Sequence, residues 1–171
     1  EEVVDLIKKH NLPVNQVVPI VTCRLSGING FTVDQLLESD SVKIRPWALT
    51  REYRVTYRDS LHISEELLEG EMHSYKRNSK DSVGVTISEG MQETLKVNVG
   101  DTLMFDIQGV PIKTFLSGIR KVEWPKDPPN FIFVFPKGVL ENAPQIWVAA
   151  TRIETPPGAV QFQQELVFKF P

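Results

Sequence analysis

Residues 97–124 read VNVGDTLMFDIQGVPIKTFLSGIRKVEW, and residues 129–135 read PNFIFVF. From residue 102 to 108, large apolar side chains alternate with other residues, which is the period of two of a half-buried strand. Gln108-Gly109 is a turn signal, and Pro111 is tolerated only at the start or the edge of a strand. No catalytic residue types cluster here, so the stretch is predicted to be scaffold. The prediction is three successive strands, at residues 102–108, 112–119 and 131–135.

Both ends of the chain carry an amphipathic helical pattern, at residues 2–10 and 159–170. Each helix needs an apolar surface to cover, and neither is long enough to be stable alone in water. Two apolar strands are predicted at 17–25 and 146–153. We therefore expect both helices to pack on one sheet formed by these two strands, with the chain termini close together at one end of the molecule.

The remaining residues predict shorter elements. Asn29-Gly30 is the strongest hairpin-type turn, and Pro19 marks an edge or a bulge in its strand. The elements expected are a helix at 32–38 capped by Thr32 or Asp34, an irregular segment at 39–50, a strand at 53–58, a helix at 64–69, a mobile connection at 76–82, a strand at 83–87, a helix from Ser88 to about Leu95 and a turn with a short helix at 136–144.

Length and composition limit the class of protein. The 171 residues suit one domain of one or two lobes, with 41% hydrophobic and 24% charged residues. The formal net charge of −3 argues against a general nucleic-acid or anionic-membrane binder. The one cysteine, Cys23, excludes an internal disulfide and is expected to be a buried strand thiol. No apolar run is long enough for a membrane-spanning helix.

The sequence offers little catalytic chemistry. Its three histidines stand outside the spacings typical of zinc sites, so no metal and no cofactor are predicted. Glu71 and His73 could form a general acid/base pair, but a solvated pair is favoured. The chain has no Gly-x-Ser-x-Gly elbow and no phosphate-binding loop. We therefore predict a protein that is not an enzyme and has no catalytic residues.

Aromatic and proline residues suggest a binding surface. Trp124 stands beside three prolines within five residues, Pro125, Pro128 and Pro129. Such a loop is stiff, loses little entropy on binding and presents a residue type enriched in binding hot spots. These four residues are the predicted partner contact. The alternating phenylalanines of 131–135 are interpreted as core rather than as a partner-facing surface.

The ordered set of short motifs carries a resemblance to a family. These motifs are V-P-I at 18–20, R-E-Y-R at 51–54, T-Y-R-D-S-L at 56–61, V-G-D-T-L at 99–103, F-D-I-Q-G at 105–109, P-N-F at 129–131 and F-P-x-G-V-L-E-x-A-P at 135–144. In order and spacing they resemble the extracytoplasmic domain of bacterial FtsX/MacB/LolC-like ABC-transporter permeases, in their YbbP-like branch. The chain departs from that pattern at Gly70-Glu71-Met72-His73, which leaves contacts there undefined.

The resemblance implies an α+β fold with a mixed sheet, of the two-lobed MacB-like periplasmic core type. A discontinuous membrane-proximal lobe would comprise residues 1–82 and 145–171, with its two terminal helices, and a smaller β-rich lobe would comprise residues 83–144. The fragment would lie between two membrane helices, on the periplasmic side of a bacterial inner membrane. It would be a non-catalytic element that binds a partner or a hydrophobic substrate and transmits ATP-driven motion.

The same resemblance implies partners. These are a second permease copy in a homodimeric transporter, a cytoplasmic ATPase subunit that acts through the membrane part, and a periplasmic partner protein or lipid-like substrate, with no nucleic acid. Two alternatives stay open from the sequence. One is a stand-alone secreted enzyme such as a hydrolase, and the other is an extracytoplasmic binding module unrelated to transport.

Overall fold

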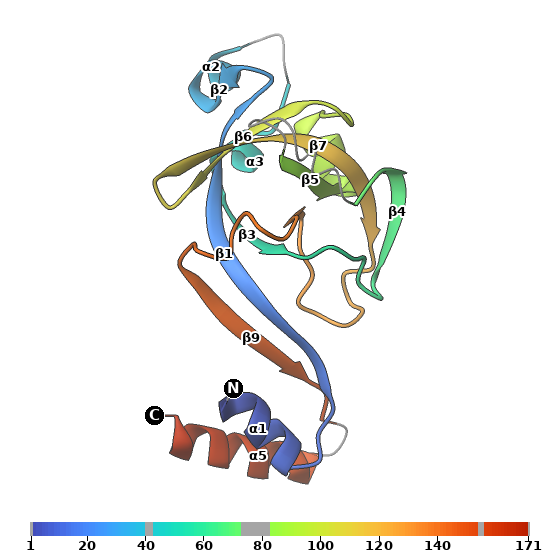
Figure 1. The fold of residues 1–171 in the computed structure, drawn as a ribbon, viewed down its shortest axis with the longest axis vertical. Helices are drawn as coiled ribbons and strands as arrows, with labels where there is room; N and C mark the ends of the chain where they lie inside the picture. The colour runs from blue at the N-terminus through green and yellow to red at the C-terminus, as the bar shows by residue number, and fades with distance from the viewer. Residues whose placement is uncertain (1, 40–42, 73–82, 154–155, 171) are drawn as a thin grey trace.

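A computed structural model describes residues 2–39, 43–72, 83–153 and 156–170 (Figure 1). The predicted mobile connection at 76–82 and one member of the Glu71/His73 pair lie outside the described residues. The helices are α1 (Glu2–Lys9), α2 (Val33–Glu38), α3 (Pro46–Thr50), α4 (Glu89–Leu95) and α5 (Pro156–Lys169). The strands are β1 (Val14–Ile28), β2 (Phe31–Thr32), β3 (Glu52–Tyr57), β4 (Glu65–Gly70), β5 (Val83–Ser88), β6 (Thr102–Ile107), β7 (Val110–Val122), β8 (Phe133–Phe135) and β9 (Gln145–Thr151).

The described strands form one mixed sheet, and the fold is α+β as predicted. Strand β1 joins much of the sheet together, because it pairs antiparallel with four strands: β9, β3, β6 and β2. It runs from the terminal helices to the far end of the molecule (Figure 1). Pro19 lies within β1, where β9 pairs along one side and the β3 register begins only at Val21. Pro19 has no N–H to donate, but no backbone hydrogen bond to β3 is needed at this position, as expected for proline at a strand edge.

The three strands predicted from residues 97–135 are confirmed. Strands β6 and β7 form a hairpin in which Ile107 pairs with Val110, and the intervening Gln108 and Gly109 both have positive φ, 53° and 94°. That geometry is the type I′ turn that suits the twist of a hairpin. Strand β7 is longer than predicted, and β8 is a three-residue strand parallel to β3 and antiparallel to β5.

Phenylalanines fill the centre of the main core. Phe105 packs edge-to-face on Phe133 and Phe135, with ring centroids 5.1 and 5.3 Å apart, and Tyr53 packs on Phe133 at 5.0 Å. Phe131 is buried in a separate cluster beneath β1 and β9. The interpretation of these phenylalanines as core is therefore confirmed.

Four local predictions are wrong. Residues 64–69 form strand β4 instead of a helix, since β4 pairs antiparallel with β7 and its Glu65 side chain is buried against two arginines. Residues 46–50 form helix α3, which Pro46 begins at its first position, where proline needs no N–H partner. Residues 136–144 contain turns but no helix. Ser88 precedes α4 as predicted, yet its side chain makes no capping hydrogen bond.

The two terminal helices pack together on the β1–β9 ribbon at one end of the molecule, where both chain ends lie (Figure 1). Leu6 and Ile7 of α1 and Phe162 of α5 are buried there. Glu165 accepts from Lys9 at 2.5 Å and lies 2.7 Å from His10 Nε2. The predicted closeness of the termini is confirmed. The division into lobes at 1–82 with 145–171 and at 83–144 stays a prediction.

Candidate interaction surfaces

The predicted contact residues lie on the molecular surface. Trp124 is 49% exposed, and it begins the segment 124–129, which we call the proline loop. Pro125 and Pro128 are exposed, whereas Pro129 is half-buried. The predicted exposure of Trp124 is therefore observed, and the contact with a partner stays a prediction.

Side-chain hydrogen bonds hold the proline loop in place. Asn130 Nδ2 donates to the carbonyl oxygens of Trp124 and Lys126, at 2.9 and 3.1 Å. Asp127 accepts a hydrogen bond from Asn15 Nδ2 at 3.0 Å and lies 3.2 Å from His62 Nε2. These contacts come from β1, from the segment before β4 and from Asn130, the residue that follows the loop. The loop is thus fixed before any partner arrives, which lowers the entropy cost of binding.

One row of hydrogen-bonded side chains has the same residue types as the catalytic triad of a serine hydrolase. It consists of Ser64, His62 and Asp127. Ser64 Oγ lies 2.9 Å from His62 Nδ1, and Asp127 lies on the opposite ring nitrogen. Ser64 is only 1% exposed, however, and its hydroxyl donates to Asn130 Oδ1 at 2.6 Å. A nucleophile must reach the substrate carbonyl. The row therefore supports the proline loop and is not arranged for attack on a substrate.

Beneath this row lies a buried ion cluster. Glu65 Oε1 accepts from Arg58 Nη2 at 2.5 Å and from Arg120 Nη1, and the side chains of Glu65 and Arg120 are fully buried. Glu65 Oε2 also accepts the backbone N–H of His62 at 3.0 Å. Arg120 donates further to Thr86 Oγ1 and to the carbonyl oxygens of Phe131 and Ile132. The cluster therefore joins β4, β7 and β5 to the segment that follows the proline loop.

The charges in this cluster remain ionised near neutral pH. Burial alone would raise the pKa of Glu65, but the guanidinium groups of Arg120 and Arg58 and the His62 N–H outweigh burial and hold that pKa below its ordinary value of 4.5. Burial lowers the pKa of Arg120 to about 10, against the attraction of Glu65. Two guanidinium groups thus share one carboxylate, and the cluster has a net positive charge.

A groove runs beside the proline loop. It is lined by Asn15, Ile63, residues 125–128 and residues 150–152, and it has a volume of about 740 Å³. Ile63 is 71% exposed at its edge. Lys126 and Arg152 give the groove two cationic side chains. Asp127 adds an acidic side chain, and Lys126 pairs with Glu123 at 3.4 Å, so the groove has a mixed polar and apolar lining.

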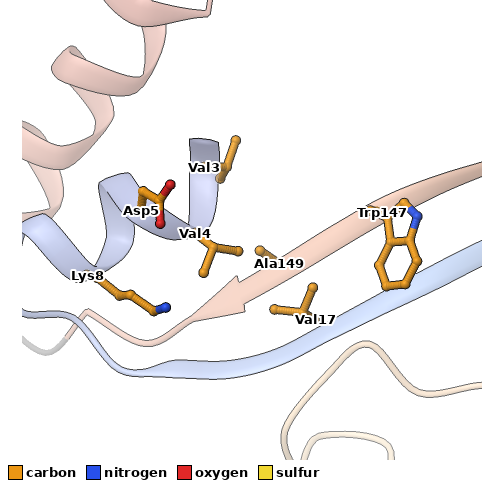
Figure 2. Close-up of a pocket in the computed structure, with 7 residues that line it drawn as sticks. All are labelled: Val3, Val4, Asp5, Lys8, Val17, Trp147 and Ala149. Atoms are coloured by element: carbon orange, nitrogen blue, oxygen red, sulfur yellow. The ribbon is translucent and has the colours of Figure 1, made fainter. Parts of the chain in front are cut away.

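A second groove lies between α1 and the β1–β9 ribbon (Figure 2). We call it the terminal groove, and it is lined by Val3, Val4, Asp5 and Lys8 of α1, Val17 of β1, and Trp147 and Ala149 of β9. Trp147 is 62% exposed and Val17 is 44% exposed. The volume is about 740 Å³. Five of the seven lining residues are apolar, so this groove suits an apolar ligand.

The sequence missed the terminal groove and the residues that fix the proline loop. No proline-rich segment beside Trp147 indicated a surface position. Its place in a predicted strand with one exposed face was the only available signal. His62 and Glu65 lie three residues apart, but Asp127 and Arg120, which they contact, come from distant segments of the chain. No group of three or more His, Cys, Asp or Glu residues in the described ranges could hold a metal ion. None of the described helices combines the length and apolar composition needed to cross a bilayer.

In sequence, the chain is similar to a bacterial transport protein. The chain is 28% identical over 152 residues to the uncharacterized ABC transporter permease YbbP of Escherichia coli (strain K12). The match covers 89% of this chain and 17% of that protein, so the chain corresponds to a small part of its relative. The resemblance to YbbP-like ABC-transporter permeases is confirmed by this match. No protein-family profile matches the chain.

A solved structure from Porphyromonas gingivalis, "a domain of a putative Permease protein", covers 98% of this chain and 75% of its own. The sequence identity is 13% and the TM-score is 0.39, so this likeness carries no argument about fold or function.

Proposed function

We propose, from the relationship of this chain to ABC-transporter permeases, that it is the non-catalytic extracytoplasmic domain of such a permease in a bacterial inner membrane. It binds a partner protein or a hydrophobic substrate and transmits motion driven by ATP hydrolysis. Its partners in the transporter are a second permease copy and a cytoplasmic ATPase subunit. The observation that carries the proposal is the similarity to a permease along 89% of the chain.

Strand β1 supports a role in transmitting motion. Its 15 residues span about 50 Å at the usual rise per residue and connect α1 to the far end of the molecule. Along this length β1 is hydrogen-bonded to four other strands. A displacement of the terminal helices therefore moves β1 and the strands paired with it, because packed interiors transmit strain.

The proline loop supports a role in partner binding. Trp124, Pro125, Pro128 and Pro129 form the contact in this proposal, with the groove beside Ile63 extending it. The loop is exposed and held by hydrogen bonds, and its rigid rings lose little freedom on binding.

The terminal groove supports a role in holding a hydrophobic substrate. Its walls are mostly apolar, with Trp147 broadly exposed at one end and Asp5 and Lys8 of α1 at the other (Figure 2). An amphiphile matches that arrangement, since its apolar part would cover Trp147 and Val17 while its polar headgroup meets Asp5 and Lys8. Ligand sites commonly combine apolar walls with a few polar groups that set orientation.

Two measurements test this proposal. The first assays the purified chain for ester, peptide and nucleotide hydrolysis, beside the Ser64→Ala variant. We expect no turnover by either protein. Turnover that Ser64→Ala or another single substitution abolishes would instead identify the secreted-hydrolase alternative.

The second measurement concerns the side of the membrane. Lys113→Cys, at an exposed position of β7, is introduced into the full-length permease in intact cells. A membrane-impermeant maleimide should label it without permeabilisation. Cys23 provides the internal control, because it is buried and should not react. Labelling of position 113 only after permeabilisation would contradict the extracytoplasmic placement.

A further inference from the structure

Helix α5 is apolar on two opposite sides. One side packs on α1 through Phe162, which is 8% exposed, and through the partly buried Leu166. The other side, which we call the outer face of α5, comprises Val160, Gln163, Gln164, Val167 and Phe168. Phe168 is 90% exposed, Val167 63% and Val160 54%. A helix that is apolar on more than one side is typically covered on each of them.

The outer face carries no charged side chain. The charged side chains on the described part of α5 are Glu165, which pairs with Lys9 on the α1 side, and Lys169. The outer face therefore offers two amides and three apolar groups. A charged protein surface would not be selected by this face, because the face has no charge of opposite sign to pair with it.

The placement of α5 makes this face an end surface of the molecule. Helix α5 lies across the long axis at the end where both termini are found, with α1 between it and the rest of the sheet (Figure 1). The face opposite α1 thus points away from the body of the protein. Under the proposed function the chain continues from this end into the membrane part of the permease.

We propose that the outer face of α5 rests on the lipid bilayer surface, with Phe168 and Val167 inserted among the acyl chains and the two glutamines at headgroup level. This inference rests on the proposed function and adds the lipid surface as a binding partner. Helices that lie in the plane of a membrane bury their apolar side in this way. Since the face has no basic group, attachment needs no anionic lipid.

The size of the face argues against a second copy of the chain as its occupant. A helix of 14 residues is about 21 Å long and about 10 Å wide, so one side presents roughly 200 Å². Stable protein interfaces bury about 800 Å² on each partner. A bilayer has no such minimum, because a helix in the membrane plane binds in proportion to the apolar area that it inserts.

The test uses a fluorescent label that reports an apolar environment. Phe168→Cys carries the label in the full chain, while Cys23 is buried and stays unlabelled. The matched control is Leu37→Cys, an exposed apolar position, 41% exposed, on α2 at the opposite end of the molecule. Both proteins are titrated with neutral phosphatidylcholine vesicles at low and high salt. We expect a blue shift at position 168 that salt does not reverse, and no shift at position 37.

A paired variant measures the strength of attachment. Val167→Ser with Phe168→Ser should lower vesicle partitioning by about a hundredfold or more, as expected from removing the two most exposed apolar side chains of the outer face. Leu37→Ser should leave partitioning unchanged. Equal shifts at positions 168 and 37, or equal partitioning of the paired variant and the parent, would overturn the proposal. So would a dimer in sedimentation that the paired variant abolishes while vesicle binding is absent.

Intact cells separate this proposal from the proposed function. In the full-length permease, the extracytoplasmic reading requires a membrane-impermeant maleimide to label position 37. The lipid-surface proposal further requires position 168 to be protected. Labelling of both positions overturns only the lipid-surface proposal. Failure to label position 37 without permeabilisation overturns the proposed function.

Discussion

Glu65→Gln is expected to destabilise the fold strongly while leaving its shape intact. The glutamine amide matches the carboxylate in size but carries no charge, so Arg120 would remain buried beside Arg58 with no counter-ion. Removing one partner of a buried ion pair costs about 3–5 kcal/mol of unfolding free energy. For a chain of this size that corresponds to a decrease in Tm of roughly 6–20 °C.

The assay is urea unfolding followed by circular dichroism, with Glu69→Gln as the control. Glu69 lies on the same strand, β4, and is exposed, so its substitution should change the unfolding free energy by less than about 0.5 kcal/mol. If Glu65→Gln is as stable as Glu69→Gln, the cluster contributes nothing and the reasoning is refuted.

The pH dependence gives a second check on the same prediction. The pKa of Glu65 is lowered by folding, so the ionised form binds to the two arginines in the native state and the stabilisation is present above the ordinary pKa of 4.5. As the pH falls through the lowered pKa, Glu65 takes up a proton and that stabilisation is lost. The difference in unfolding free energy between the parent and Glu65→Gln should therefore be constant near neutral pH and shrink in acid. A difference that grows in acid would contradict this sign.

The structure supports three further predictions, two on substitutions and one on the reactivity of Cys23. Trp124→Ala should change stability by less than about 1 kcal/mol, because the side chain is 49% exposed, yet reduce partner binding by about tenfold or more, measured by calorimetry. Cys23 should resist thiol reagents at pH 8 until the chain is unfolded, because burial, with Glu52 and Asp106, raises the pKa of its thiol to about 12; fast native labelling would refute this. Gly70→Ala should destabilise by about 2 kcal/mol or more in thermal unfolding, since φ is +77° and an added Cβ would meet Ser117 O at 2.1 Å.

The elements with local signals were predictable from sequence. The Asn29-Gly30 turn has positive φ at both residues, 50° and 84°, as its dipeptide predicts. Thr32 caps α2 in a capping box with Gln35, another local pattern. The terminal helices were found from their own residues, and the apolar face of α1 is buried as expected. For α5 the predicted apolar side, with Val160 and Val167, was wrong, because that side is exposed and Phe162 packs on α1 instead. In each case the information lies within a few residues of the feature.

The elements fixed by distant residues were not predictable. Strand β4 looks helical because its sequence holds three glutamates and two leucines, which have good helix propensity. Pairing with β7 and the burial of Glu65 against Arg120, 55 residues away, override that preference. The same holds for the proline loop, whose exposure follows from composition but whose anchors, Asn15 and His62, come from distant segments.

The central claim is that this domain moves in response to ATP. The direct measurement places a spin label at Lys126→Cys, in the proline loop, in the full-length permease reconstituted with its ATPase subunit. The spectrum is recorded without nucleotide, with ATP and with ADP, beside an ATPase variant that cannot hydrolyse ATP. We predict a spectral change during ATP turnover that the inactive ATPase does not produce. Identical spectra in every nucleotide state would contradict the claim.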